Sequence, residues 1–493
     1  MFLKSAKTLF YASLFSVIWV LPNTFFPFIG GKYFFFRTMV ALAAGSYLLS
    51  WAFEDKGGHL HHDLKALLKK PLFIAVSVFV LVMVLAALFA YSPHAAFWSN
   101  FERGEGAFQM IHYYLFFTLG LLLLKEWRDW KIAFWLSLIA GLLMIGYGVL
   151  GYLNVLNCHP AQYPDGQPPI SCAESPAAGF ISAYQSTPAE RIPTNIVGLF
   201  TQERFQGSLG NPAYVAPYLL FSLAYLAWLW VMGKDKREKN KKSWGSALFY
   251  AGLGLIFLTF LILSQTRGGF LGLVAGLVVA LVYAGITVPK LRRWIVSVGL
   301  IGLILLGALF VMRDNPTISQ LPVSRLFEIN PFDQTAQTRF WTWGSAWEGI
   351  KERPLLGWGQ ENFSHVFDKH FDERHFIPNQ GTETWFDRSH SIFFDYGVTT
   401  GLLGLLSYLV MIAVFVWPHI KNIFAFWKGS DRGSTPNIMS SIIIFIATAY
   451  FVQALILFDV LPIYINLFLV MAFSVFLIEE GHPPKAHANH HDR

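Results

Sequence analysis

A short polar stretch, Ser264–Gly269, separates two apolar runs that are each long enough to cross a membrane. It carries Arg267, and a guanidinium next to hydrocarbon costs about 3 kcal/mol or more unless it faces water, protein or a counter-ion. Ser264, Gln265 and Thr266 add hydrogen-bonding groups, and the two glycines that follow let backbone or a ligand approach closely. The stretch therefore suits a site for an anionic group at the membrane surface. The alternative is an arginine that reaches from a helix end to lipid headgroups.

Three further polar segments could supply partners for this turn. They hold Arg204 with Asn211, then Arg339, and then Asp387, Arg388 and His390. Arginine grips phosphate or carboxylate at two points, and histidine exchanges a proton near neutral pH. Each segment alone is a weak signal, because loop arginines often only pair with acids and a lone histidine is more often structural.

The composition shows what kind of fold must position these residues. The chain has 493 residues, of which 54% are hydrophobic and 14% charged, against about a quarter charged for a soluble domain. This predicts an all-α polytopic membrane protein with about twelve transmembrane helices. The predicted spans lie near residues 8–24, 36–53, 71–91, 108–124, 131–153, 212–232, 244–264, 269–288, 295–312, 392–416, 437–458 and 462–478.

The basic residues predict the orientation, because cytoplasmic loops retain Lys and Arg. With both termini in the cytoplasm, the inner segments hold 23 of the 37 basic residues, and 17 of these 23 are lysine. On the outer side 11 of 14 are arginine. The charge of +7 therefore follows from topology and requires no nucleic acid as a partner. The turn at Arg267 is predicted at the outer face.

The spans and loops divide the chain into six parts. These are membrane helices in 1–153, an extracytoplasmic loop in 154–211, membrane helices with the Arg267 turn in 212–312, a large extracytoplasmic loop in 313–391, membrane helices in 392–478 and a cytoplasmic tail in 479–493. Loops of this length are usually functional or disordered.

The two outer loops differ in character. The first contains Cys158 and Cys172, which we expect to form a disulfide in an oxidising compartment, the alternative being two free thiols. The second has apolar residues at helical spacing at Phe340, Trp343 and Trp347, which predict an amphipathic helix at the outer interface. No phosphate-binding loop, no Asp-x-Asp pair and no organised set of metal ligands is found, so we expect no cofactor and no metal.

Taken together and in this order, the polar segments resemble the O-antigen ligase and polymerase family, which includes protein O-oligosaccharyltransferases. The resemblance covers about residues 190 to 410. It is carried by the Arg-x-x-Gly-x-x-x-Asn-Pro run from Arg204, the turn at Arg267, Arg339 with the later Pro-Leu-Leu-Gly-Trp-Gly, and His390 with Gly401 and Gly404. Two positions depart from the family, which commonly has Asn where Ser391 stands and Glu where Thr399 stands.

The resemblance implies transfer of a glycan from a polyprenyl diphosphate carrier to an acceptor hydroxyl at the outer face of the cytoplasmic membrane, without metal or nucleotide. Arg204, Arg267 and Arg339 would stabilise the charge that develops on the leaving diphosphate. His390 would take the proton of the acceptor or, alternatively, donate to the diphosphate. Further substrate-binding candidates are Ser264, Gln265, Thr266, Asn211, Asp387 and Arg388.

Two questions stay open at this level. The acceptor could be lipid A core, a second glycan or a protein, since the three enzyme types share one donor chemistry. The chain could also be a transporter of a lipid-linked or anionic glycan, although transporters tend to show internal repeats and none is detected. Besides donor and acceptor, membrane lipids are the expected partners.

Overall fold

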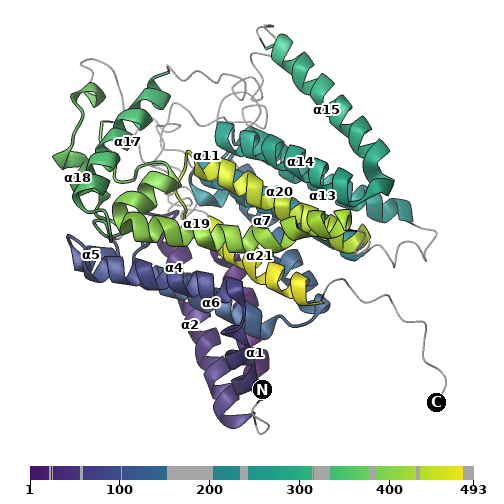
Figure 1. Cartoon of the computed structure of the whole chain (residues 1–493), viewed down its shortest axis with the longest axis horizontal. Coiled ribbons are helices and arrows are strands. Elements are labelled where there is room, and N and C mark those ends of the chain that lie inside the picture. Colours follow the sequence, from purple (N-terminus) through teal and green to yellow (C-terminus); the bar gives the residue numbers. More distant parts are fainter. Residues whose placement is uncertain are drawn as a thin grey trace, which may run out of the picture.

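The described part of the chain is helical throughout (Figure 1). The computed structural model describes residues 1–21, 24, 26–55, 59–100, 103–152, 204–233, 243–313, 315, 333–376, 384–428 and 434–480. Cys158 and Cys172, most of the first outer loop and nearly all of the tail lie outside these residues, so the predicted disulfide is a matter for experiment. No strand occurs in the described ranges.

Ten of the described helices are long and apolar enough to cross a membrane. They are α2 (Gly30–Phe53), α4 (Pro71–Leu88), α7 (Trp127–Tyr152), α11 (Pro212–Met232), α13 (Ser243–Leu263), α14 (Arg267–Thr287), α15 (Arg292–Val311), α19 (Ile392–Trp427), α20 (Ser434–Ala454) and α21 (Leu461–Glu480). The other two predicted spans form shorter helices. These are α1 (Phe2–Ser13) continued by η1 (Leu14–Ile18), and α6 (Ala107–Leu123). The chain is therefore a multi-pass membrane protein.

The helices differ in how deeply they are enclosed. Every residue of α21 from Leu461 to Leu477 is buried, so this helix forms the centre of the bundle. No residue of α15 is buried, and Figure 1 shows α15 standing apart from the others. A helix that is apolar all round and enclosed belongs to a core, whereas one that is apolar and exposed in a membrane protein faces lipid.

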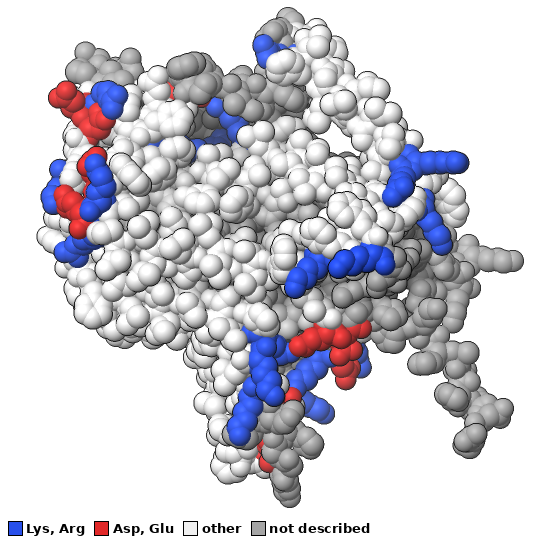
Figure 2. All heavy atoms as spheres, viewed as in Figure 1, with Lys and Arg blue, Asp and Glu red and all other residues white. Residues whose placement is uncertain are grey.

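Charged side chains leave a wide uncharged band across the molecule (Figure 2). Lys70 pairs with Glu479 and Lys125 with Asp63, which joins segments predicted on the inner side. Arg103–Asp387 and Arg267–Asp333 instead join segments predicted on the outer side. Segments predicted to share a side of the membrane therefore contact one another.

The seam between α14 and α20 is unusually close because glycine lines it. A β-carbon on Gly272 would lie 2.6 Å from the Ala449 carbonyl oxygen, and one on Gly276 would lie 2.7 Å from that of Phe445. Small residues at this spacing let helix backbones touch, which is the main attractive contact available to helices in lipid. The seam fixes the outer end of α14, where Arg267 stands.

A small outer unit caps the bundle at the end where α19 begins. It consists of α17 (Gln334–Glu352), α18 (Phe363–Lys369), η7 (Glu373–His375) and the turn Pro354–Gly359, and its core is formed by Ala346, Ile350, Trp358, Phe363, Val366, Phe367, Phe386 and Val398. The short helix α5 (Pro93–Trp98) packs beside it against α4 and α6. The predicted amphipathic helix is α17. It buries mainly small residues, while Phe340 and Trp347 are exposed.

The Pro-Leu-Leu-Gly-Trp-Gly turn is joined to α19 by backbone hydrogen bonds. The Trp358 and Gly359 amides donate to the carbonyl oxygens of Val398 and Thr399, at 2.9 and 2.7 Å, and the Leu402 amide donates to Pro354 at 2.7 Å. α19 is broken at this point, because Gly401 has non-helical dihedral angles. Two motifs about 45 residues apart thus form one junction between the outer unit and the membrane helices.

Candidate active site

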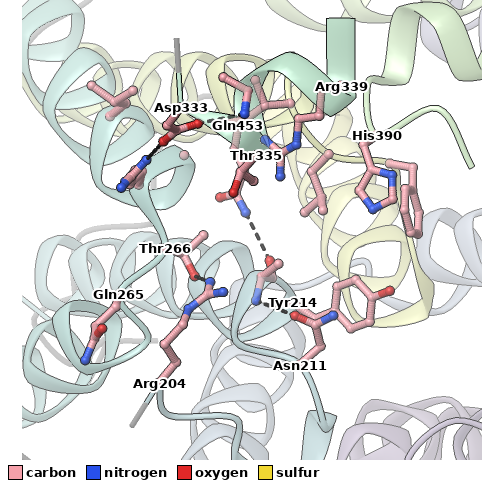
Figure 3. Close-up of a pocket in the computed structure, with 18 residues that line it drawn as sticks. Arg204, Asn211, Tyr214, Gln265, Thr266, Asp333, Thr335, Arg339, His390 and Gln453 are labelled. Carbon is pink, nitrogen blue, oxygen red and sulfur yellow. Dashed lines mark hydrogen bonds and ion pairs between the residues drawn. The ribbon is translucent and has the colours of Figure 1, made fainter. Parts of the chain in front are cut away.

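A cavity of about 460 Å³ lies where the outer unit meets the bundle. Figure 3 shows side chains from several helices converging on it. It is lined by Arg204, Asn211, Ala213, Tyr214, Gln265, Thr266, Arg267, Gly268, Leu271, Asp333, Thr335, Ala336, Arg339, His390, Gln453, Ile456, Leu457 and Phe458. The structure thus brings seven of the residues predicted from sequence to one cavity: Arg204, Asn211, Gln265, Thr266, Arg267, Arg339 and His390.

Three helices begin at the cavity. α11 starts at Pro212 after its N-cap Asn211, α14 starts at Arg267 after Thr266, and α17 starts at Gln334 after its N-cap Asp333. The N-terminus of a helix carries about half a positive charge and favours anions. The backbone of three helices therefore adds to the positive charge of the arginine side chains.

Arg204 is held against the polar turn. Its Nε donates to the Ser264 carbonyl oxygen at 3.2 Å, and its Nη2 donates to the Thr266 hydroxyl at 3.3 Å. The Ser264 side chain is fully buried and donates to the Leu261 carbonyl oxygen at 2.6 Å. Ser264 therefore acts here through its backbone, and Thr266 places the guanidinium at the cavity.

Arg267 forms an ion pair with Asp333 across the cavity, with Nη1 2.8 Å from Oδ2. Asp333 also caps α17, since its Oδ1 accepts from the Ala336 amide at 2.7 Å. Partial burial opposes ionisation of Asp333, but the hydrogen bonds from Arg267 and Ala336 outweigh it and lower its pKa. Asp333 thus ties the first turn of α14 to the first turn of α17.

The two glycines of the turn make room for neighbouring helices. A β-carbon on Gly269 would lie 2.5 Å from Cβ of Ala216 in α11, and one on Gly268 would lie 2.7 Å from Cδ1 of Ile456. The close approach expected at these glycines is therefore between protein segments. It sets the position of the arginine that precedes them.

His390 lies between two aromatic rings. Its ring centre is 5.4 Å from that of Phe386 and 5.2 Å from that of Phe458, both edge to face. Its backbone is in the left-handed region, with φ of 54°. Burial and the nearby positive charge of Arg339 lower the pKa of His390 to about 4. The imidazole is therefore neutral at pH 7.

The hydrogen bond of His390 decides which ring nitrogen can accept a proton. Nδ1 lies 3.1 Å from the Arg388 carbonyl oxygen. Because a carbonyl oxygen only accepts, Nδ1 must carry the hydrogen, and Nε2 of the neutral ring then has the free lone pair. A ring in this state accepts a proton at Nε2 and has no second N–H to offer a phosphate.

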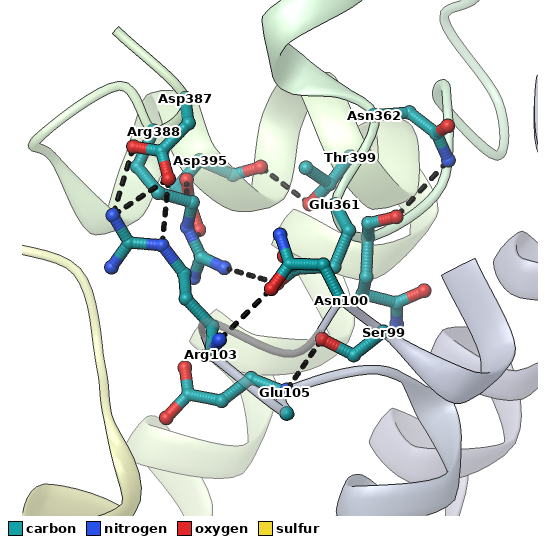
Figure 4. A network of polar contacts seen from close by, with 12 residues as sticks. Ser99, Asn100, Arg103, Glu105, Glu361, Asn362, Asp387, Arg388, Asp395 and Thr399 are labelled. Carbon is teal, nitrogen blue, oxygen red and sulfur yellow. Dashed lines mark hydrogen bonds and ion pairs between the residues drawn. The ribbon is translucent and has the colours of Figure 1, made fainter. Parts of the chain in front are cut away.

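Asp387 and Arg388 do not line the cavity but belong to what we call the buried charge network, which consists of Arg103, Glu361, Asp387, Arg388 and Asp395 (Figure 4). Arg388 pairs with Asp395 at 2.9 Å and with Glu361 at 3.2 Å. Burial favours the neutral arginine, but the carboxylates of Asp395 and Glu361 outweigh it and raise the pKa of Arg388 far above its usual value. Figure 4 shows the guanidinium of Arg103 beside the carboxylate of Asp387, to which it donates hydrogen bonds.

Sequence reasoning missed several lining residues. Asp333 could have been found, because an Asp before a helical stretch is a common N-cap. Tyr214 and Gln453 lie in the end turns of α11 and α20, and Phe458 lies in the segment between α20 and α21. No local pattern distinguishes them from ordinary bundle residues. Gln453 donates from its amide to the Ala213 carbonyl oxygen at 3.2 Å, so it joins α20 to α11 at the cavity edge. Among the described residues, no group of three His, Cys, Asp or Glu is arranged to hold a metal.

The fold and the cavity define a class: a multi-pass membrane protein with a cationic, histidine-bearing cavity at one end of its bundle. Residues 251–409 match the family model described as O-antigen ligase. An O-antigen ligase of Salmonella typhimurium is 27% identical over 172 residues, covering 34% of this chain and 39% of the relative. An uncharacterized protein of Haemophilus influenzae is 26% identical over 188 residues, covering 37% of this chain and 46% of the relative.

Over residues 251–409 the chain is thus similar to the O-antigen ligase family, in line with the resemblance of its motifs. The matched region runs from α13 to α19 and contains Arg267, Arg339 and His390. The alignments span less than half the length of each curated relative.

Proposed function

We propose that this protein transfers a glycan from a polyprenyl diphosphate carrier to an acceptor hydroxyl at the outer face of the cytoplasmic membrane. The observation that carries the proposal is the meeting of three arginines, three helix N-termini and one neutral histidine at a single cavity. The cavity lies at the end of the bundle of membrane helices where the outer unit joins it, so a carrier lipid could reach it from the bilayer.

The charge of the cavity suits a diphosphate. Among the described side chains that line it, three are arginine and one is aspartate, so its formal charge is +2 with His390 neutral. A diphosphate that is esterified at both ends carries about two negative charges and gains more on one phosphate when the sugar leaves. Positioned guanidinium groups and helix N-termini stabilise that developing charge.

The transfer step follows from this arrangement. The acceptor hydroxyl gives its proton to Nε2 of His390 while its oxygen bonds to the anomeric carbon of the donor sugar. The bond between that carbon and the diphosphate oxygen breaks, and the electron pair leaves with the diphosphate. Arg204, Arg267 and Arg339 would hold the leaving group, and the hydrogen bond from Nδ1 to Arg388 would stabilise the imidazolium.

The bound donor would also tune the base. Burial beside arginine lowers the pKa of His390 to about 4. An anionic diphosphate among the arginines offsets their charge and raises this pKa toward the operating pH, where a general base is most effective. Binding of the donor would thus raise the basicity of the residue that deprotonates the acceptor.

The test is an assay of the purified protein with a polyprenyl-diphosphate oligosaccharide. Lipid A core, a second lipid-linked glycan and a peptide are offered as separate acceptors. Glycosylated acceptor together with released polyprenyl diphosphate supports the proposal, and the product identifies the acceptor. In reconstituted vesicles, movement of the intact donor across the bilayer with no cleavage would instead assign the protein to transport.

A matched pair of variants relates the assay to the cavity. Arg204→Ala removes a guanidinium that lines the cavity, whereas Arg374→Ala removes an exposed one that pairs with Asp372 in the outer unit. We expect loss of transfer in the first and normal transfer in the second. Equal effects in both variants would contradict a specific role for the cavity.

A further inference from the structure

The buried charge network touches the cavity from behind, through one aromatic side chain. Phe458 lines the cavity, and its ring stacks under two guanidinium groups, with Cζ of Arg103 at 5.0 Å and Cζ of Arg388 at 4.8 Å from the ring centre. The same ring meets the edge of His390. Phe458 thus separates two arginines of the network from the candidate base while it contacts all three.

Arg103 enters this network from a distant part of the chain. It lies in the loop between α5 and α6, outside the region that matches the family model. Its Nε and Nη2 donate to the two carboxylate oxygens of Asp387, each at 2.8 Å. A two-point contact of this kind fixes direction as well as distance. The loop before α6 is thereby held against the loop that carries His390 by a bidentate ion pair.

The backbone conformation of His390 requires stabilising contacts from its surroundings. A left-handed backbone is uncommon for a residue other than glycine and persists only where the surroundings enforce it. Three contacts surround it: Arg103 holds Asp387, Arg388 is buried against Asp395 and Glu361, and Nε1 of Trp343 donates to the Ser389 carbonyl oxygen at 2.9 Å. The Arg388 carbonyl oxygen that accepts from Nδ1 of His390 lies within this fastened segment.

We propose that Arg103 is a positioning residue for the transfer reaction, and that its ion pair with Asp387 and its stacking on Phe458 hold His390 in its reactive place. This inference rests on the proposed function, because it assigns His390 as the base. Arg103 does not line the cavity and is not expected to contact substrate. Its effect reaches the reaction through Asp387 and Phe458.

The inference can be tested through charge, because Arg103 and Asp387 shift the pKa of His390 in opposite directions. The positive charge of Arg103 disfavours protonation of His390, and the negative charge of Asp387 favours it. The other charged groups near His390, the cavity and the network are Arg339 of α17 and its N-cap Asp333, Arg267 of α14, Arg204, Arg388 of the same loop, Glu105, Glu361, Asp395 and Asp459. These are kept constant in the comparison.

The experiment compares Arg103→Gln, Asp387→Asn, the double variant and Arg103→Lys in the full-length protein. The assay is transfer from a polyprenyl-diphosphate oligosaccharide to the acceptor that the wild type uses. We expect both single variants to lower kcat on the order of 10- to 100-fold with little change in KM, as misplacing a catalytic group does. The acid limb of the pH profile should move to higher pH in Arg103→Gln and to lower pH in Asp387→Asn.

The remaining variants separate charge from geometry. The double variant should return the acid limb close to its wild-type position. Arg103→Lys keeps the charge, so its limb should stay in place, but one ammonium cannot hold both carboxylate oxygens and kcat should remain low. Arg374→Gln, at an exposed ion pair of the outer unit, is the control that leaves both quantities unchanged. Limbs that move in the same direction in both single variants, or an unchanged kcat, would overturn the proposal.

A second readout does not depend on transfer. Diethyl pyrocarbonate modifies neutral imidazole, so the pH dependence of modification at His390, followed by peptide mass spectrometry, reports its protonation directly. The same opposite shifts are expected in Arg103→Gln and Asp387→Asn. Should the wild type transfer no glycan, the proposed function fails while this measurement still decides whether Arg103 acts on His390. If Arg103→Gln does not insert, Asp387→Asn and Arg103→Lys carry the comparison.

Discussion

Gly401 and Gly357 cross backbone to backbone where the outer unit joins the bundle. A β-carbon on Gly357 would lie 2.6 Å from the Gly401 amide nitrogen, and one on Gly401 would lie 2.3 Å from the Leu355 carbonyl carbon. Gly401 has φ of 67° and ψ of −173°, a region that is essentially restricted to glycine. The two glycines therefore let the Pro354–Gly359 turn enter the break in α19.

Gly401→Ala should separate the outer unit from the membrane helices. The backbone strain alone costs about 1–3 kcal/mol, and the overlap with Leu355 adds to it. We expect a lower thermal unfolding temperature and strongly reduced transfer. Gly344→Ala is the matched control, because Gly344 lies in α17 with nothing within 4 Å of the added carbon. An unfolding temperature of Gly401→Ala that equals that of the control would show that this crossing is not needed.

Arg267→Ala should abolish transfer while the protein remains folded and inserted, because the guanidinium lines the cavity and faces the proposed leaving group. Asp333→Ala removes the partner of Arg267 and the cap of α17, so it should cost about 1 kcal/mol of stability. Its transfer should fall less than that of Arg267→Ala. Normal turnover in Arg267→Ala would refute the diphosphate clamp.

His390→Ala should lower kcat far more than it weakens donor binding. A base acts on the acceptor proton in the transition state, so its loss leaves ground-state binding of the donor nearly intact. Donor binding is measured separately, by titration of the purified variant with polyprenyl-diphosphate oligosaccharide. Unchanged turnover with weakened binding would instead make His390 a ligand of the diphosphate.

The pH dependence of transfer should reveal the protonation of His390. The neutral ring is the active form, so kcat/KM should rise with pH and reach half its maximum near the pKa of about 4. Below that pH the ring is protonated and the rate falls. Because the bound diphosphate raises this pKa, the acid limb of kcat should lie at higher pH than that of kcat/KM. Coincident limbs would contradict the proposed coupling between donor and base.

Much of the fold was accessible from sequence because apolar run length alone marks a membrane helix. The predicted span at 212–232 coincides with α11, and the span predicted from 269 begins in the structure at Arg267. The extent of α19 was less accessible, since the helix continues to Trp427 beyond its predicted end. The apolar pattern there gives way to mixed residues, and a proline, Pro418, lies inside the helix, so the local sequence argues against its continuation.

The residue types of the site could be predicted from sequence, but the ion-pair partners of those residues could not. Arginine beside a membrane helix has few uses, so Arg204, Arg267 and Arg339 could be singled out one by one. The partners of Arg267 and Asp387 could not, because Asp333 and Arg103 lie 66 and 284 residues away from them and no periodicity links such distances. Asp387 and Arg388 were predicted to bind substrate, and the structure places them in ion pairs with protein.

The glycine seam between α14 and α20 also bears on what can lie beneath the cavity. At Gly272 and Gly276 the backbone of α14 meets the carbonyl groups of Ala449 and Phe445, so no side chain fits between the two helices at these positions. The polar lining of the cavity, to which α14 contributes Arg267, Gly268 and Leu271, therefore gives way to a contact between backbones one turn further along the helix.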